Sequence, residues 1–146
     1  MTAATAAPAW RPAAPVPYAA PLPAVDQLRV DPRDGGWTIT ARVAVDPESP
    51  NLAGHFPGQP IYPGVFVVET LCQAMAQAVP GAPRLRAVTS IRFLAALLGG
   101  DEMELTLDVK PMASTSPGWA VRGTARRNDG TVTAQLRAVF DAGAGA

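Results

Sequence analysis

The sequence is poor in several residue types that carry chemistry. It has one histidine, one cysteine and one lysine, and its 12 basic and 12 acidic residues cancel. Zero net charge gives no reason to expect a general affinity for nucleic acid or for an anionic membrane. The single cysteine, Cys72, cannot form an intramolecular disulfide and lies in an apolar run. We therefore expect a protein of a reducing compartment whose partners are small molecules or other proteins.

Long apolar runs are missing as well. No stretch reaches the roughly 18 apolar residues of a membrane-spanning helix, and the Ala/Pro-rich beginning lacks the basic region and unbroken hydrophobic core of a secretory signal. We expect a cytoplasmic protein. Its 146 residues, 48% of them hydrophobic, are enough for one domain with a real core.

The beginning of the chain has a composition that disfavours a packed element. Residues 1–23 contain six prolines and nine alanines, and each proline removes a backbone hydrogen-bond donor. We predict a mobile N-terminal arm over 1–23, a folded domain over 24–140 and a flexible tail over 141–146.

Alternation of apolar and polar residues predicts an antiparallel sheet. The period of two that is typical of half-buried strands occurs in four segments, and two more segments are compatible with strands. The turn residues Asn128-Asp129-Gly130 predict a hairpin near the C-terminus. The expected strands, about six in number, cover 25–30, 37–45, 86–93, 103–109, 119–125 and 132–140.

One segment, 65–79, predicts a long buried helix. Pro63-Gly64 precedes it and Pro80-Gly81 follows it, which is the usual punctuation of a helix. Glu69, Gln73 and Gln77 are four positions apart and share one face, so we expect the Gln73 side chain to hydrogen-bond the Glu69 carboxyl group. A single apolar helix beside an antiparallel sheet predicts that the sheet wraps around the helix.

The best candidates for chemistry are His55 and Glu69, fourteen positions apart. Histidine titrates near neutral pH, so the two side chains could supply a base and an acid. Two structural roles remain open at this point: a lone histidine is more often structural than catalytic, and Glu69 could instead pair with an arginine such as Arg92.

The segment around His55 resembles the 3-hydroxyacyl-acyl-carrier-protein dehydratases of the hot-dog fold, the FabZ/FabA type. The resemblance implies an α+β protein in which a curved antiparallel sheet of about six strands wraps around one long central helix. It also implies a dimer whose active sites lie at the interface, where His55 of one chain faces Glu69 of the other. The matching residues are Gly54-His55-Phe56-Pro57-Gly58, Pro60, Pro63-Gly64-Val65, Glu69 and Gln73.

The resemblance also implies a reaction. His55 would remove the proton next to a thioester carbonyl, Glu69 would protonate the departing hydroxyl group, and the product would be a trans-2-enoyl thioester. The Gly64 N–H is the expected donor to the charge that develops on the thioester oxygen. A glutamate at the acid position is typical of the branch that dehydrates without isomerising the double bond. The supporting residues are Gln73, Phe56, Pro57, Gly58, Pro63 and Val65.

The implied partners are an acyl carrier protein, whose phosphopantetheine arm carries the substrate, and a second hot-dog chain in a homodimer or heterodimer. No metal or other cofactor is implied, and the pathway is fatty-acid or polyketide synthesis. The segment Leu94–Leu98 stands where relatives place basic residues for an acidic carrier, and if exposed it would indicate a contact with another protein chain. The remaining candidates for carrier docking are Arg84, Arg86, Arg126 and Arg127.

Two other functions are compatible with the sequence. The chain could be a catalytically weak or silent subunit of a heteromeric dehydratase, although the presence of both His55 and Glu69 argues against silence. An acyl thioesterase of the same fold is less favoured, because such enzymes generally lack the His-Phe-Pro-Gly block.

Overall fold

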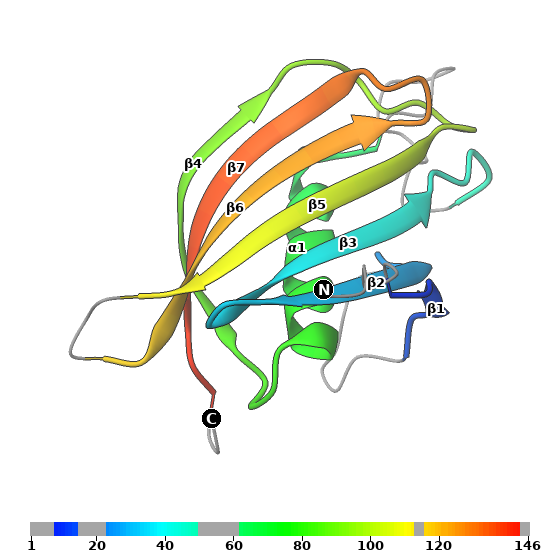
Figure 1. The fold of residues 1–146 in the computed structure, drawn as a ribbon. Coiled ribbons are helices and arrows are strands. Elements are labelled where there is room, and N and C mark those ends of the chain that lie inside the picture. The colour runs from blue at the N-terminus through cyan, green and yellow to red at the C-terminus, as the bar shows by residue number, and fades with distance from the viewer. Residues whose placement is uncertain (1–7, 15–22, 50–61, 113–115, 144–146) are drawn as a thin grey trace, which may run out of the picture.

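A computed structural model describes residues 8–14, 23–49, 62–112 and 116–143. In these ranges one helix lies against one face of a curved, fully antiparallel sheet with the strand order β1-β2-β3-β5-β6-β7-β4 (Figure 1). This is the architecture that the sequence predicts. The elements are β1 (Arg11–Pro12), β2 (Gln27–Arg33), β3 (Gly36–Ala44), α1 (Gly64–Ala78), β4 (Arg84–Phe93), β5 (Glu102–Pro111), β6 (Gly118–Arg127) and β7 (Val132–Asp141).

The apolar half of each central strand forms the core. Ile39 of β3 lies opposite Leu107 of β5, and both side chains are fully buried. Burial of a side chain of this size contributes roughly 1.5–3 kcal/mol. A shift of one residue in either strand would turn the apolar side chains to the solvent face, so the alternation that predicts the strands also fixes their register.

Helix α1 buries one side against this sheet. Val67, Leu71 and Met75 follow one another at intervals of four and are almost completely buried. The helix begins after Pro63 and ends one residue before Val79, within one residue of the predicted bounds at each end. The apolar run and its Pro-Gly punctuation were therefore sufficient to locate it.

Residues 8–14, within the predicted N-terminal arm, are packed against the sheet. Pro12 of β1 pairs with Gln27 at the edge of the sheet, a position where a missing N–H is tolerated. The centroid of the Trp10 ring lies 3.7 Å from the guanidinium carbon of Arg42 and 4.6 Å from the guanidinium carbon of Arg29. These cation–π contacts hold a proline-rich segment whose composition alone gives no reason for order.

The last strand is tied to the loop before β6 by a hydrogen bond just after its end. Strand β7 continues to Asp141, and the Ala142 N–H donates a hydrogen bond of 3.1 Å to the Pro117 carbonyl. The domain start at residue 24 stays a prediction.

Among the described residues, no helix combines the length and the hydropathy needed to cross a bilayer.

Candidate active site

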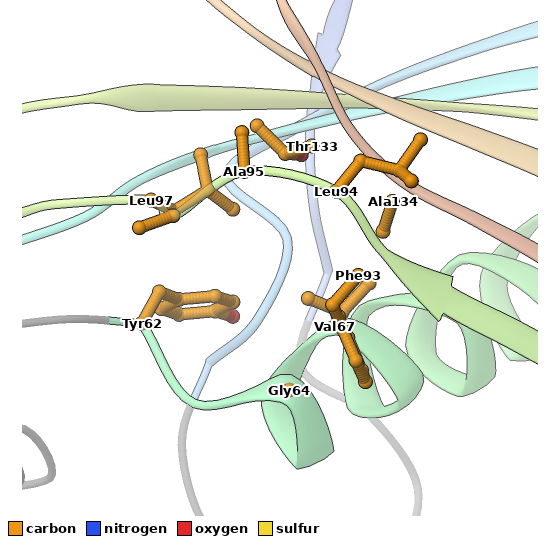
Figure 2. A pocket seen from close by; sticks show the side chains of 10 residues that line it. Tyr62, Gly64, Val67, Phe93, Leu94, Ala95, Leu97, Thr133 and Ala134 are labelled. Atoms are coloured by element: carbon orange, nitrogen blue, oxygen red, sulfur yellow. The ribbon is translucent and has the colours of Figure 1, made fainter.

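A cavity of about 520 Å³ lies beside the N-terminus of α1 (Figure 2). Its walls come from the beginning of the helix, the segment after β4 and the start of β7, and most of its side chains are apolar. Both the volume and the lining are those of a small-molecule site. The lining residues are Tyr62, Gly64, Val67, Phe93, Leu94, Ala95, Ala96, Leu97, Thr133 and Ala134.

Tyr62 is a rigid wall of this cavity. Its N–H donates to the Leu97 carbonyl over 2.7 Å, and its hydroxyl group lies 3.3 Å from Thr70 Oγ1 and donates to the Phe66 carbonyl over 3.4 Å. Burial raises the pKa of Tyr62 to about 12, against a smaller lowering by the Thr70 hydrogen bond. The phenol therefore stays protonated near neutral pH and serves for packing and hydrogen bonding.

Gly64 allows Phe93 to lie directly against the start of the helix. A Cβ atom at position 64 would come within 2.5 Å of Phe93 Cζ, so only glycine permits this contact. The Pro63 carbonyl accepts the Phe66 N–H over 3.0 Å, and the preceding N–H groups of the first turn have no partner within the helix, as in most helices. The part of the chain that is described shows no acceptor for the Gly64 N–H.

The polar side of α1 carries an ordered network around Glu69. Gln73 is 2% exposed; its Nε2 donates to Glu69 Oε1 over 2.9 Å, and its Oε1 accepts the Ala24 N–H over 2.8 Å. Because a backbone N–H can only donate, Ala24 fixes the amide with its NH₂ group toward Glu69. The predicted hydrogen bond between Gln73 and Glu69 is therefore present, and its direction is defined.

Arg92 does not pair with Glu69. Its side chain is exposed on β4, and it has no ion pair with any carboxylate of the described ranges. The alternative of a structural Glu69–Arg92 pair is therefore wrong. The reason is the strand period: Ile91 faces the core opposite Leu136, which turns the next residue outward.

Glu69 and the cavity lie on different sides of α1. Val67 lines the cavity, while Glu69 is not among its described lining residues. Two positions along a helix correspond to about 200° of rotation, so the two side chains diverge. Within one chain, the structure does not bring Glu69 to the cavity at Gly64.

Several predicted site residues fall outside the described residues, namely His55, Phe56, Pro57 and Gly58, and their roles stay predictions. Pro63 and Val65 flank Gly64 at the helix start, and Val65 is 69% exposed. The sequence reasoning assigned no role to Tyr62 or Phe93. Tyr62 stands inside the family-like segment and could have been found there, whereas the contact between Phe93 and Gly64 requires the folded sheet.

The four predicted docking arginines do not form one patch. Arg84 and Arg86 begin β4, beside the end of β7, whereas Arg126 and Arg127 end β6, beside the start of β7. Ten residues of β7 separate the two groups by roughly 30 Å. Arg86 pairs with Asp141 at 3.9 Å, and Arg127 pairs with Asp129 at 3.0 Å. The leucine-rich segment is also divided, since Leu97 is buried and Leu94 is 49% exposed.

The family model described as ApeI-like, ApeI dehydratase, matches residues 31–131, which is more than half of the chain. The chain belongs to the ApeI-like dehydratase family. This dehydratase is 33% identical over 102 residues to the 3-hydroxyacyl-[acyl-carrier-protein] dehydratase FabZ of Haemophilus influenzae, covering 64% of the chain and 68% of that relative. The expectation that the protein is a dehydratase is thus confirmed.

Solved structures confirm the hot-dog fold of this dehydratase. The dehydratase heterocomplex ApeI:P from Xenorhabdus doucetiae gives a TM-score of 0.57 at 18% identity, over 71% of this chain and 87% of that one. The (R)-hydratase from A. caviae involved in PHA biosynthesis gives 0.60 at 15% identity, over 73% and 94%. At these identities the likeness concerns the fold alone.

Proposed function

We propose that this dehydratase removes water from (3R)-3-hydroxyacyl thioesters carried by acyl carrier protein, to give trans-2-enoyl thioesters without isomerisation, as a FabZ-type enzyme of fatty-acid or polyketide synthesis. The substrate named for the Haemophilus influenzae relative supports this reading. The observation that carries it is the Glu69 carboxyl group, which Gln73 holds in place on the central helix of a dehydratase fold.

In the proposed reaction His55 takes a proton from the α-carbon, which is next to the thioester carbonyl. The bond between the β-carbon and its hydroxyl oxygen breaks. Glu69 gives its proton to the leaving hydroxyl group, so one water departs and the new double bond forms. The negative charge that develops on the thioester oxygen is met by the Gly64 N–H, at the positive end of the helix dipole. No cofactor other than the carrier's phosphopantetheine arm is proposed.

The proposal includes a second hot-dog chain. The exposed large apolar residues of the described chain all lie in α1, in β4 or directly after β4: Val65, Leu85, Phe93 and Leu94. Strand β4 is an edge strand that pairs with β7 alone among the described strands. A partner strand on this edge would satisfy its open backbone groups and cover the apolar residues. It would also allow Glu69 of one chain to approach the cavity of the other.

A heteromeric dehydratase is the second candidate. The similar Xenorhabdus structure is a dehydratase heterocomplex, which favours testing whether this chain works with a different hot-dog subunit. The open β4 edge would accept either kind of partner. A thioesterase is the third and least favoured function.

The test is mass spectrometry of a 3-hydroxyacyl-acyl-carrier protein after incubation with the purified chain. Loss of one water by the wild type and not by His55→Ala supports a self-sufficient dehydratase. Loss of water only after addition of another hot-dog chain supports the heteromeric alternative. Release of the free carrier thiol would identify a thioesterase and overturn the proposal.

A further inference from the structure

The face of the sheet opposite α1 carries three arginines close together. Arg122 of β6 and Arg137 of β7 are register partners, and Arg92 of β4 is the partner of Gln135, two residues from Arg137. All three arginine side chains are exposed, while Val121, Gly123, Leu136 and Ala138 beside them are buried toward the helix. The strand period therefore turns the arginines to the outer face. We refer to Arg92, Arg122 and Arg137 as the outer arginine cluster.

The cluster forms no ion pairs within the described residues, although Asp108 lines a neighbouring hollow together with Lys110, Arg122 and Arg137. None of its members has an ion pair with a carboxylate of the described residues. Asp108, the register partner of Arg122 on β5, instead lies 3.7 Å from Lys110 Nζ. Two like charges directly opposite each other destabilise a sheet. In a chain with no net charge, the outer arginine cluster therefore concentrates positive charge on one part of the sheet.

The cluster also lines a hollow. A depression of about 380 Å³ on the outer face is lined by all three arginines and by no acidic residue among those described. The other polar groups in its walls are neutral hydrogen-bonding side chains that suit carboxylate oxygens. The lining residues are Ser90, Arg92, Arg122, Gly123, Thr124, Gln135, Leu136 and Arg137.

The spacing of the arginines matches that of carboxylates on a helix. Cross-strand neighbours such as Arg122 and Arg137 have Cβ atoms roughly 5 Å apart, and the diagonal neighbour Arg92 is roughly 7–8 Å from Arg137. Side chains at positions i and i+4 of a helix are about 5–6 Å apart at Cβ. We propose that the outer arginine cluster docks an acidic helical segment of a partner protein, with glutamates or aspartates one turn apart.

A protein segment fits the cluster better than a small anion does. A single phosphate can contact two guanidinium groups, whereas the cluster extends over three strands and a hollow much larger than one ion. The outer arginine cluster lies on the reverse side of the strands that form part of the cavity wall. Phe93 and Ala134 line the cavity, whereas their sequence neighbours Arg92 and Gln135 line the hollow. The inference does not depend on the proposed function.

The test is fluorescence anisotropy at low ionic strength with a labelled alanine-based helical peptide that carries glutamates one turn apart. The Arg122→Gln/Arg137→Gln variant is expected to bind the peptide about tenfold more weakly than the wild type, because two of the three cations that meet the glutamates are removed. Arg33→Gln is the matched control: Arg33 is an exposed arginine of β2 that pairs with Asp31. It should bind the peptide as the wild type does.

The stability of the variants separates docking from a structural role. Removal of the opposed charges should leave the Tm unchanged or raise it, whereas loss of a structural contact would lower it. Equal binding by the double variant, or equal binding of a peptide with glutamines in place of glutamates, would overturn the proposal. Displacement of the peptide by an equal concentration of inorganic phosphate would indicate a small-anion site instead. Loss of self-association in the double variant would identify a contact between copies of this chain.

Discussion

The two sides of helix α1 use their polar groups in different ways. On the Glu69 side, Gln73 ties the carboxyl group to the Ala24 backbone, so the acid is held in a fixed position. On the cavity side the walls are mostly apolar, and the Gly64 N–H has no acceptor among the described residues. One side thus presents a fixed carboxyl group, and the other presents a binding space with a backbone N–H at its edge. In the proposed dimer, the Glu69 side of one chain and the cavity side of the other would together form one active site.

The largest expected effect concerns Glu69, the proposed general acid. Glu69→Gln should reduce kcat by about 10²- to 10⁴-fold, because general acid catalysis is lost while the hydrogen bond with Gln73 remains available. Glu48→Gln, at an exposed turn, is the control and should keep wild-type kcat. Steady-state assay of enoyl thioester formation measures both, and an unchanged kcat in Glu69→Gln would make its role structural.

Mixing two inactive variants tests whether the halves belong to different chains. If His55 of one chain works with Glu69 of the other, random exchange of His55→Ala and Glu69→Gln chains should restore roughly a quarter of wild-type activity, because half the dimers carry one intact site of two. If both residues act within one chain, the mixture should stay inactive.

The next effect concerns the contact between Gly64 and Phe93. Gly64→Ala places a methyl group where the Phe93 ring lies, and that exposed ring must move aside. We expect a loss of turnover of roughly tenfold to 100-fold, since access to the Gly64 N–H is hindered, with less than about 1 kcal/mol change in the free energy of unfolding. Turnover and urea unfolding measure the two quantities.

The double variant Gly64→Ala/Phe93→Ala removes the ring and should recover part of the turnover lost in Gly64→Ala. If the double variant recovers no turnover, the methyl group at position 64 hinders access to the N–H by itself, without any contribution from the displaced ring. A large loss of stability in the single variant would contradict the expectation that the exposed Phe93 ring moves aside at little cost.

Gln73 and Gln77 form a matched pair on the Glu69 side. Gln73→Leu leaves the buried Ala24 N–H without an acceptor and should cost about 1–3 kcal/mol in the free energy of unfolding. Gln77→Leu removes an exposed hydrogen bond of 2.8 Å to the Ala14 N–H and should cost less than about 0.5 kcal/mol. Urea unfolding compares them, and equal costs would mean that the Gln73 network does not hold the helix.

One further effect is confined to high pH and is absent near neutral pH. The pKa of Tyr62 is raised from 10.0 to about 12, mainly by burial, so the unfolded chain loses this proton first. The stabilising contribution is complete below pH 10 and is lost as pH rises toward 12, by up to about 2–3 kcal/mol. Tyr62→Phe should show a flatter decline in urea unfolding over this range.

The Tyr62 measurement is best made in a Cys72→Ala background. Partial burial, with a smaller contribution from the charge of Glu69, raises the pKa of Cys72 from 9.0 to about 11, so its thiol titrates in an overlapping range. Identical slopes with and without the Tyr62→Phe substitution would show that the phenol is not desolvated in the folded state.

Some features were predictable because they depend on local periodicity. The alternation in 132–140 and the turn residues Asn128-Asp129-Gly130 gave β7 and its hairpin, where Gly130 has a φ of 88° and its N–H donates to the Arg127 carbonyl. The four-residue spacing of Glu69 and Gln73 gave their hydrogen bond. Each of these features depends on residues that are close in sequence, so the order of the residues is sufficient to predict it.

Other features depend on segments that are far apart in sequence. Nothing in the sequence distinguishes the surroundings of Arg126 from those of Arg84, yet the sheet places the two residues at opposite ends of β7. The packed position of Pro12 depends on Gln27 and on the arginines around Trp10, which composition does not reveal.

The helix, the strands with their inward faces and the family resemblance could all be predicted from the order of the residues, because hydrophobic period and a dense local motif are properties of neighbouring residues. Three features emerge only when the chain is folded: Phe93 packs against Gly64, Glu69 lies away from the cavity, and the arginines of the outer arginine cluster lie together on the outer face. The physical reason is the strand order: it brings β4 beside β7 and the helix start, and no local pattern specifies which distant strand becomes a neighbour.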